Sequence, residues 1–168
     1  PALGTEKVLL ERSLDDETSF APKISLGDYT NSATVSVAYT QSGADMTTVE
    51  NFDCTVEGIP LQKWVSLIMV VNNRALDIYI DGKLVKTCII PGIPKLAQES
   101  NSLVVTPAGR AFKGFTSRVR YLDHAISPSK AYQIYKEGYK SVLGNVFSKY
   151  SVKLGFYENS KEIQSISF

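Results

Sequence analysis

The sequence predicts an all-β protein, an antiparallel β-sandwich with one short helix near residues 128–137. Three observations lead to this class. Short stretches of alternating apolar and polar residues recur along the chain, turn residues separate them, and one segment has helical spacing with helix-end signals. The length of 168 residues, with 43% hydrophobic and 21% charged residues, suits one domain with a sizeable core.

The first two-fifths of the chain predict strands that end at turn residues. Apolar residues recur or alternate at 7–11, 22–27 and 34–39, and Asn31-Ser32 and Ser42-Gly43 provide breaks. These strands are short and evenly separated, as expected for a sandwich.

The middle of the chain predicts a buried strand followed by a hairpin. Residues 64–71 are apolar at nearly every position, which indicates a strand covered on both faces, and Trp64 at its start is assigned to the core. Asp81-Gly82 then predicts a two-residue type I′ hairpin turn, because that turn needs positive φ at both central positions. The returning strand, 83–90, ends before Pro91 because proline cannot donate to a ladder.

The last third predicts two more strands, the helix and a C-terminal hairpin. Strands are expected at 102–106 and 115–122. Ser127-Pro128 opens the helix as N-cap and first residue, and Gly138 closes it. Alternation returns in the final segment, 151–168, on both sides of a turn.

Four motifs together carry a resemblance. They are W-V-S-L-I-M-V-V at 64–71, L-D-I-Y-I-D-G-K-L-V at 76–85, F-K-G-F-T-S-R-V-R-Y at 112–121 and A-I-S-P-S-K-A-Y-Q-I-Y-K-E-G at 125–138. This pattern resembles the laminin-G-like branch of the concanavalin A-like lectin/glucanase superfamily, and it implies a jelly-roll sandwich.

A narrower resemblance extends over nearly the whole chain. It rests on E-K-V-L-L-E-R at 6–12, I-P-L-Q-K-W at 59–64, G-K-L-V-K-T-C at 82–88 and K-Y-S-V-K-L at 149–154. These stretches look like the laminin-G-like domains encoded by large nucleocytoplasmic DNA viruses, several of which are virion components. The resemblance implies a non-enzymatic minor capsid protein that docks against other major or minor capsid proteins, located in the virion and assembled in the infected cell.

The same resemblance implies something about domain boundaries. Members of that group usually carry further strands, and sometimes a membrane anchor, before the point that corresponds to Glu6. Residues 1–168 are therefore expected to form one domain that lacks its first strands, with the C-terminal hairpin at 151–168.

Charge is distributed unevenly along the chain. Residues 1–60 carry ten acidic side chains against three basic ones, whereas residues 61–168 carry fifteen basic against seven acidic. Surfaces of opposite sign would suit docking of protein subunits, although folding can also interleave the two halves and remove the asymmetry. The basic residues form no run, so nucleic acid is not an expected partner.

The two cysteines leave two alternatives open. Cys54 and Cys88 both lie in alternating, strand-like stretches, so a disulfide between strands is geometrically conceivable. Two buried free thiols are the favoured interpretation, because cysteine is among the residues that are most often fully buried.

The superfamily includes glycoside hydrolases, which place paired carboxylates on one strand face at even spacing. Glu50, Asp53 and Glu57 mix even and odd positions, so they do not share one strand face. Asp77 and Asp81 are both at odd positions, but Asp81 lies at the hairpin turn, where aspartate is favoured for its conformation. We therefore expect no catalytic pair and no enzyme.

Metal and cofactor sites are not expected either. His124 is the only histidine, and with two cysteines it offers no zinc-ligand spacing. The loop acids match no dense calcium-binding loop; they are Asp15, Asp16, Asp28 and Asp45.

Carbohydrate binding is the rival function, in which the domain would act as a lectin-like module for a host or virion glycan. A sugar site stacks a ring on an exposed aromatic and adds hydrogen bonds from polar groups. The candidate platforms are Tyr29, Tyr39, Tyr79 and Tyr157, and the candidate partners are Asn31, Asn72 and Asn73. For a protein partner, the candidate patch is Arg118 and Arg120, which share one face of the expected strand 115–122.

Overall fold

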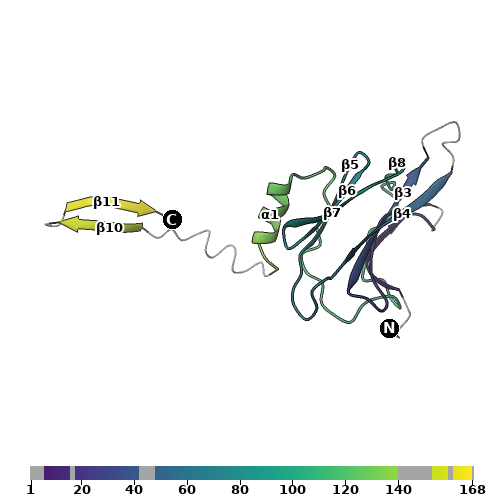
Figure 1. Ribbon diagram of the computed structural model, residues 1–168, viewed down its shortest axis with the longest axis horizontal. Coiled ribbons are helices and arrows are strands. Elements are labelled where there is room, and N and C mark those ends of the chain that lie inside the picture. The colour runs from purple at the N-terminus through teal and green to yellow at the C-terminus, as the bar shows by residue number, and fades with distance from the viewer. Residues whose placement is uncertain (1–5, 16–17, 42–47, 140–152, 159–160, 168) are drawn as a thin grey trace.

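The computed structural model describes residues 6–15, 18–41, 48–139, 153–158 and 161–167, the last two ranges as backbone. Within these ranges the chain forms eleven strands and one nine-residue helix (Figure 1). The paired strands are antiparallel, so the predicted all-β sandwich is confirmed.

The larger sheet contains most of the N-terminal strands. Its order is β4-β3-β2-β1-β9, and β8 pairs with the end of β3. The strands are β1 (Lys7–Ser13), β2 (Phe20–Leu26), β3 (Ser32–Thr40), β4 (Val49–Glu57), β8 (Ile93–Pro94) and β9 (Val104–Val105).

The smaller sheet is a meander in the order β5-β6-β7, formed by β5 (Leu67–Asn72), β6 (Ala75–Ile80) and β7 (Lys83–Ile89). The predicted hairpin joins β6 to β7. Asp81 and Gly82 have φ values of 49° and 74°, the two positive angles that a type I′ turn requires.

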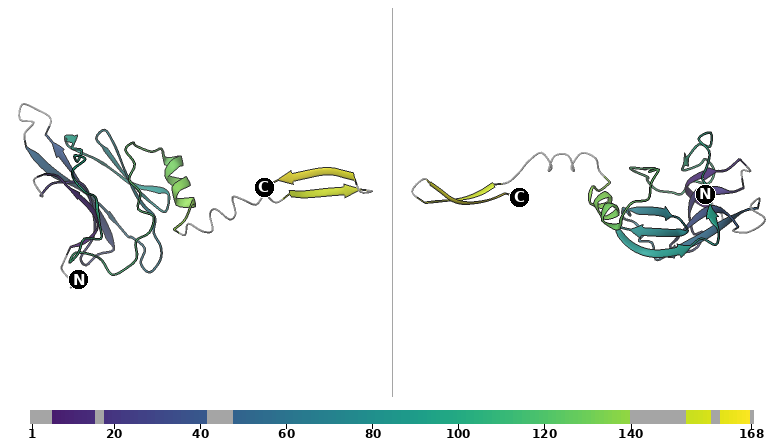
Figure 2. Two further views of the ribbon diagram at one scale, coloured as in Figure 1. Left: turned by 180° about the vertical axis from the view of Figure 1, so that it is seen from behind. Right: turned by 90° about the horizontal axis from the view of Figure 1, so that it is seen from above.

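The molecule has three layers, namely the larger sheet, the smaller sheet and the helix α1 (Pro128–Lys136) (Figures 1 and 2). Between the sheets, the core includes Val35 of β3 and Leu76 and Ile78 of β6. On the other face of the smaller sheet, Tyr79 of β6 packs with Ala131 of α1. The two faces of β5 and β6 are therefore both packed, which explains why the sequence around β5 is apolar at successive positions.

The helix begins and ends where the sequence predicts. The Ser127 side chain accepts a hydrogen bond from the Lys130 backbone N–H at 3.2 Å, and Pro128 is the first helical residue. Gly138 has a φ of 67° just after the last turn, the left-handed geometry that favours glycine there.

The C-terminal hairpin is also confirmed. It consists of β10 (Lys153–Glu158) and β11 (Lys161–Ser167). In Figures 1 and 2 this hairpin lies beyond α1, apart from the sandwich.

Two predictions are wrong. Residues 115–122 form no strand, and Arg118 in that segment has a φ of 54°, which interrupts an extended conformation. Trp64 is not in the core: its exposed fraction is 43%, and β5 begins three residues later, at Leu67.

Candidate interaction site

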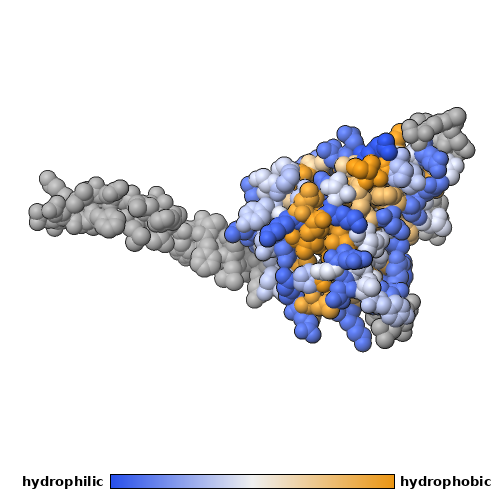
Figure 3. Space-filling model, in the orientation of Figure 1, coloured by the Kyte–Doolittle hydropathy of each residue, from blue (hydrophilic) through white to orange (hydrophobic). Residues whose placement is uncertain are grey.

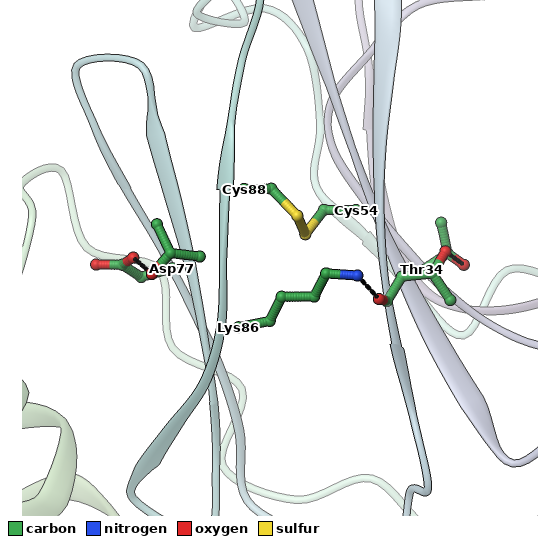
Figure 4. Close-up of a disulfide and its surroundings, with 7 residues drawn as sticks. Thr34, Cys54, Asp77, Lys86 and Cys88 are labelled. Carbon is green, nitrogen blue, oxygen red and sulfur yellow. Dashed lines mark hydrogen bonds between the residues drawn. A yellow bond between two sulfur atoms is a disulfide. The ribbon is translucent and has the colours of Figure 1, made fainter.

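A disulfide joins the two sheets at one side of the sandwich. Cys54 of β4 and Cys88 of β7 are bonded, with 6.2 Å between their Cα atoms (Figure 4). The favoured expectation of free thiols is therefore wrong, and the alternative of a disulfide is confirmed. In the register of the strands Cys54 faces the buried Val35 and Cys88 faces the buried Leu76, which puts both sulfur atoms between the sheets.

A hydrogen bond crosses the same edges. Lys86 of β7 donates from Nζ to the Thr55 carbonyl of β4 at 2.7 Å, and the dashed line from Lys86 in Figure 4 marks this bond. The disulfide and this bond close the sandwich along the β4 and β7 edges.

Arg118 and Arg120 lie beside the C-terminal end of α1. Both guanidinium groups contact the Glu137 carboxylate, at 3.1 and 2.6 Å respectively. Arg118 also donates to the carbonyls of Glu137 and Gly138, at 3.0 and 2.7 Å, where the helix leaves carbonyls without helical partners. The hydrogen bond from Arg120 is the main cause that lowers the pKa of Glu137.

These contacts give the two arginines a role inside the chain. They hold the 115–122 segment against the helix end without any strand pairing. A role of Arg118 and Arg120 in binding a protein partner stays a prediction.

The carboxylates considered for catalysis do not form a pair. Glu50 accepts a hydrogen bond from the Tyr39 hydroxyl at 2.5 Å, and this bond is the main cause that raises the pKa of Tyr39. Asp53 and Glu57 are exposed and lie on the opposite face of β4 from Glu50, as their mixed parity predicts.

The second candidate set has structural partners. Asp77 accepts from the Thr87 hydroxyl on the neighbouring strand at 2.6 Å. Asp81 accepts from the Ser66 backbone N–H at 2.9 Å and pairs with Lys63 at 3.2 Å. Both carboxylates therefore act within the smaller sheet and its turn.

The metal candidates are dispersed. His124 contacts the carboxylate of its neighbour Asp123 at 2.8 Å, and both side chains are largely exposed. Asp15 accepts from the side chains of Gln98 and Asn101. Asp28 lies in an exposed loop, whereas Asp16 and Asp45 fall outside the described residues.

Across the described ranges, no three His, Cys, Asp or Glu side chains come together as a metal site. In the same ranges, no helix is long and apolar enough to cross a membrane.

Among the candidate sugar platforms, Tyr39 and Tyr79 are buried, which leaves them unable to stack on a ligand. The side chain of Tyr157 lies outside the described residues. Tyr29 is 77% exposed and shares a loop with the exposed Asn31. The other candidate partners, Asn72 and Asn73, are exposed at the turn between β5 and β6.

The surface has a crevice of about 1480 Å³ whose lining does not include the cysteines of the disulfide. We call it the open flank. Its lining includes residues 67–71 of β5, Leu10 of β1 and Ile24 of β2. Consecutive residues of a strand point to opposite faces, so a crevice lined by five in succession must run along the edge of β5. In the described residues this edge pairs with no other strand.

Residues 112–126 also line the crevice, and they include the segment 115–122 for which a strand was expected. Several of its large apolar side chains are exposed; they are Phe115, Val119, Tyr121 and Leu122. At the rim, Trp64 stacks on Tyr139 with ring centroids 4.4 Å apart and planes inclined by 12°. This stack explains why Trp64 stays out of the core.

The open flank was not predicted from the sequence. The sequence signal related to the open flank is the strand-like alternation at 115–122. In the structure this segment pairs with no strand, so it does not extend either sheet. On the face drawn in Figure 3, further apolar residues gather in the region of β7 beside α1.

The fold and the site define a disulfide-linked β-sandwich with an apolar flank. No family model matches the chain, and no curated protein matches it. Among solved structures, the chain is similar to residues 221–444 of an S-layer domain-containing protein from Clostridium thermocellum ATCC 27405, with 14% identity and a TM-score of 0.35. The match covers 80% of this chain and 64% of that chain.

Proposed function

We propose that this chain is a non-enzymatic structural domain that docks against other protein subunits, and specifically a minor capsid protein of a large DNA virus. The observation that carries the docking role is the open flank, where a strand edge and exposed apolar side chains lie together. Apolar surface of this kind typically marks a protein interface. The capsid assignment rests on the laminin-G-like motifs and on their similarity to domains from such viruses.

Two further features support a structural role. The disulfide across the sheets stabilises the sandwich against unfolding, which suits a domain that is held in a lasting assembly. The carboxylates and the histidine that could have served catalysis are engaged in local structural contacts or are dispersed.

Particle analysis tests the proposal directly. Purified virions are stripped of loosely attached proteins, the shells are analysed by mass spectrometry, and cryo-EM maps are searched for the sandwich. The expected result is stoichiometric density in fixed contact with capsid subunits. Absence of the chain from stripped shells would refute the capsid role.

A carbohydrate-binding module is the second candidate, and one observation favours it. The exposed Tyr29 and Asn31 occupy a single loop at the rim of the open flank, which is the combination that a sugar site needs. A glycan array with the recombinant domain tests this function. Binding that Tyr29→Ala abolishes would establish it, and an array without specific binders would exclude it.

A further inference from the structure

The sandwich closes on one side and is incomplete on the other. The larger sheet has five strands in its main path, whereas the smaller sheet has three. The disulfide holds the β7 edge against β4, so the difference in strand number falls at the β5 edge. An unpaired edge presents a row of backbone N–H and C=O groups that another strand can satisfy.

The open flank has the features that an added strand requires. The edge of β5 supplies backbone donors and acceptors, and residues 112–126 also line the flank. Apolar side chains are among the lining residues, including Met69 of β5 and Phe115. Phe115 is 86% exposed, so the sandwich itself does not cover it.

Within the described residues, the hairpin β10–β11 forms a sheet of two strands that pairs with neither of the larger sheets. An isolated two-stranded hairpin is at best marginally stable in water, and it gains stability when a third strand or a packing surface is added. Its sequence carries Leu154, Phe156, Ile163 and Ile166, residue types that suit burial. Its strands have six and seven residues, and β5 has six, so the lengths match.

We propose that the C-terminal hairpin of one copy of this chain inserts into the open flank of a second copy and pairs with the edge of its β5. This is strand addition, in which main-chain hydrogen bonds supply affinity and alternate side chains fill pockets. Each copy then offers one hairpin that can insert and one open flank that can receive a hairpin. Reciprocal exchange closes a dimer, and unreciprocated exchange extends a chain of subunits.

One observation favours a second copy over the same chain as acceptor. In Figures 1 and 2 the hairpin lies apart from its own sandwich, beyond α1, and in the described residues it pairs with no strand of that sandwich.

The test uses the full chain with one variant on each surface. Ile166→Pro removes a ladder donor from β11, and Ile166→Val is its matched control. Phe115→Asp places a charge in the lining of the open flank at a residue that is already exposed. Ile89→Asp is its matched control, because Ile89 is 61% exposed on β7 and lies outside the flank.

Light scattering during gel filtration, over a micromolar dilution series, should show dimers or larger species for the wild type. Ile166→Pro and Phe115→Asp should each weaken association by about tenfold or more, and the two controls by less than about twofold. Mixing Ile166→Pro with Phe115→Asp should restore a heterodimer. The first variant keeps an intact open flank, and the second keeps an intact hairpin. Hydrogen exchange should show that the β5 amides pointing away from β6 are protected in the wild type and exposed in Ile166→Pro.

Three results would overturn the proposal. They are a monomeric wild type with β5 protected, which would place the hairpin on its own chain; a monomeric wild type with β5 exposed; and an oligomer that neither variant weakens. The proposal does not depend on the capsid role, because self-association and presence in virions are measured separately.

Discussion

The disulfide between Cys54 and Cys88 should account for a large share of the stability of the sandwich. The sequence separation of the two residues is 34, so the bond closes a long loop and restricts the unfolded chain. For a loop of this size the chain-entropy relation gives about 4 kcal/mol. The whole stability of a small domain is only about 5–15 kcal/mol, so loss of the bond should be readily measured.

Urea unfolding measures this effect in the oxidised and the reduced wild type. Reduction should lower the midpoint by about 2 M, on a urea dependence of about 2 kcal/mol per M. The matched variant is Cys54→Ala/Cys88→Ala. It lacks the bond and also two buried sulfur atoms, so its additional loss relative to reduced wild type measures packing alone.

A thiol assay completes the design. The chain has two cysteines, so unfolded but unreduced protein should show no reactive thiol. Two reactive thiols, or a midpoint that reduction leaves unchanged, would show that the bond does not form and would refute the explanation of how the β4 and β7 edges are held.

Three further predictions follow from the packing and the charges. Leu76→Ala should cost about 2–5 kcal/mol in urea unfolding, because the side chain is fully buried between the sheets; a smaller loss would mean that the core collapses around the gap. Gly82→Ala should cost about 1–2 kcal/mol more than Gly58→Ala. Both glycines have a φ of 74°, but an added Cβ at Gly82 would meet the side chains of Tyr132 and Tyr135 at 3.0 Å, whereas at Gly58 it would meet nothing within 4 Å. Equal losses would contradict the packing of the turn against α1. Glu137→Gln should release the guanidinium groups of Arg118 and Arg120, which NMR spectra of the arginine side chains would report. In the wild type the same release should come as the pH falls below the ordinary Glu value of 4.5, because the pKa of Glu137 is lowered in the folded chain and its ion pairs are lost on protonation. Arginine side-chain chemical shifts that stay unchanged between pH 3 and 7 would rule out this anchor.

Local patterns were sufficient for most of the strands and for the helix. The β6–β7 turn follows from Asp81-Gly82, and the helix ends follow from Ser127-Pro128 and Gly138, because each depends on the conformational preference of one or two residues. The C-terminal hairpin followed from alternation around a turn for the same reason.

The errors arose where the partner of a segment decides its conformation. Residues 115–122 alternate like a strand, yet they form none, since Arg118 and Arg120 bind the end of α1 and no neighbouring strand supplies a ladder. Trp64 is apolar and adjoins a buried strand, but stacking on Tyr139 holds it at the rim.

The sequence by itself determined that this chain is an all-β sandwich with a capped helix, because alternation, turn residues and helix caps act over a few neighbouring residues. Only the tertiary structure decided that Cys54 and Cys88 are bonded and that the edge of β5 is left open. Both depend on which strand edges of the two sheets face each other. That is set by contacts between residues far apart in the chain, and no local pattern encodes it.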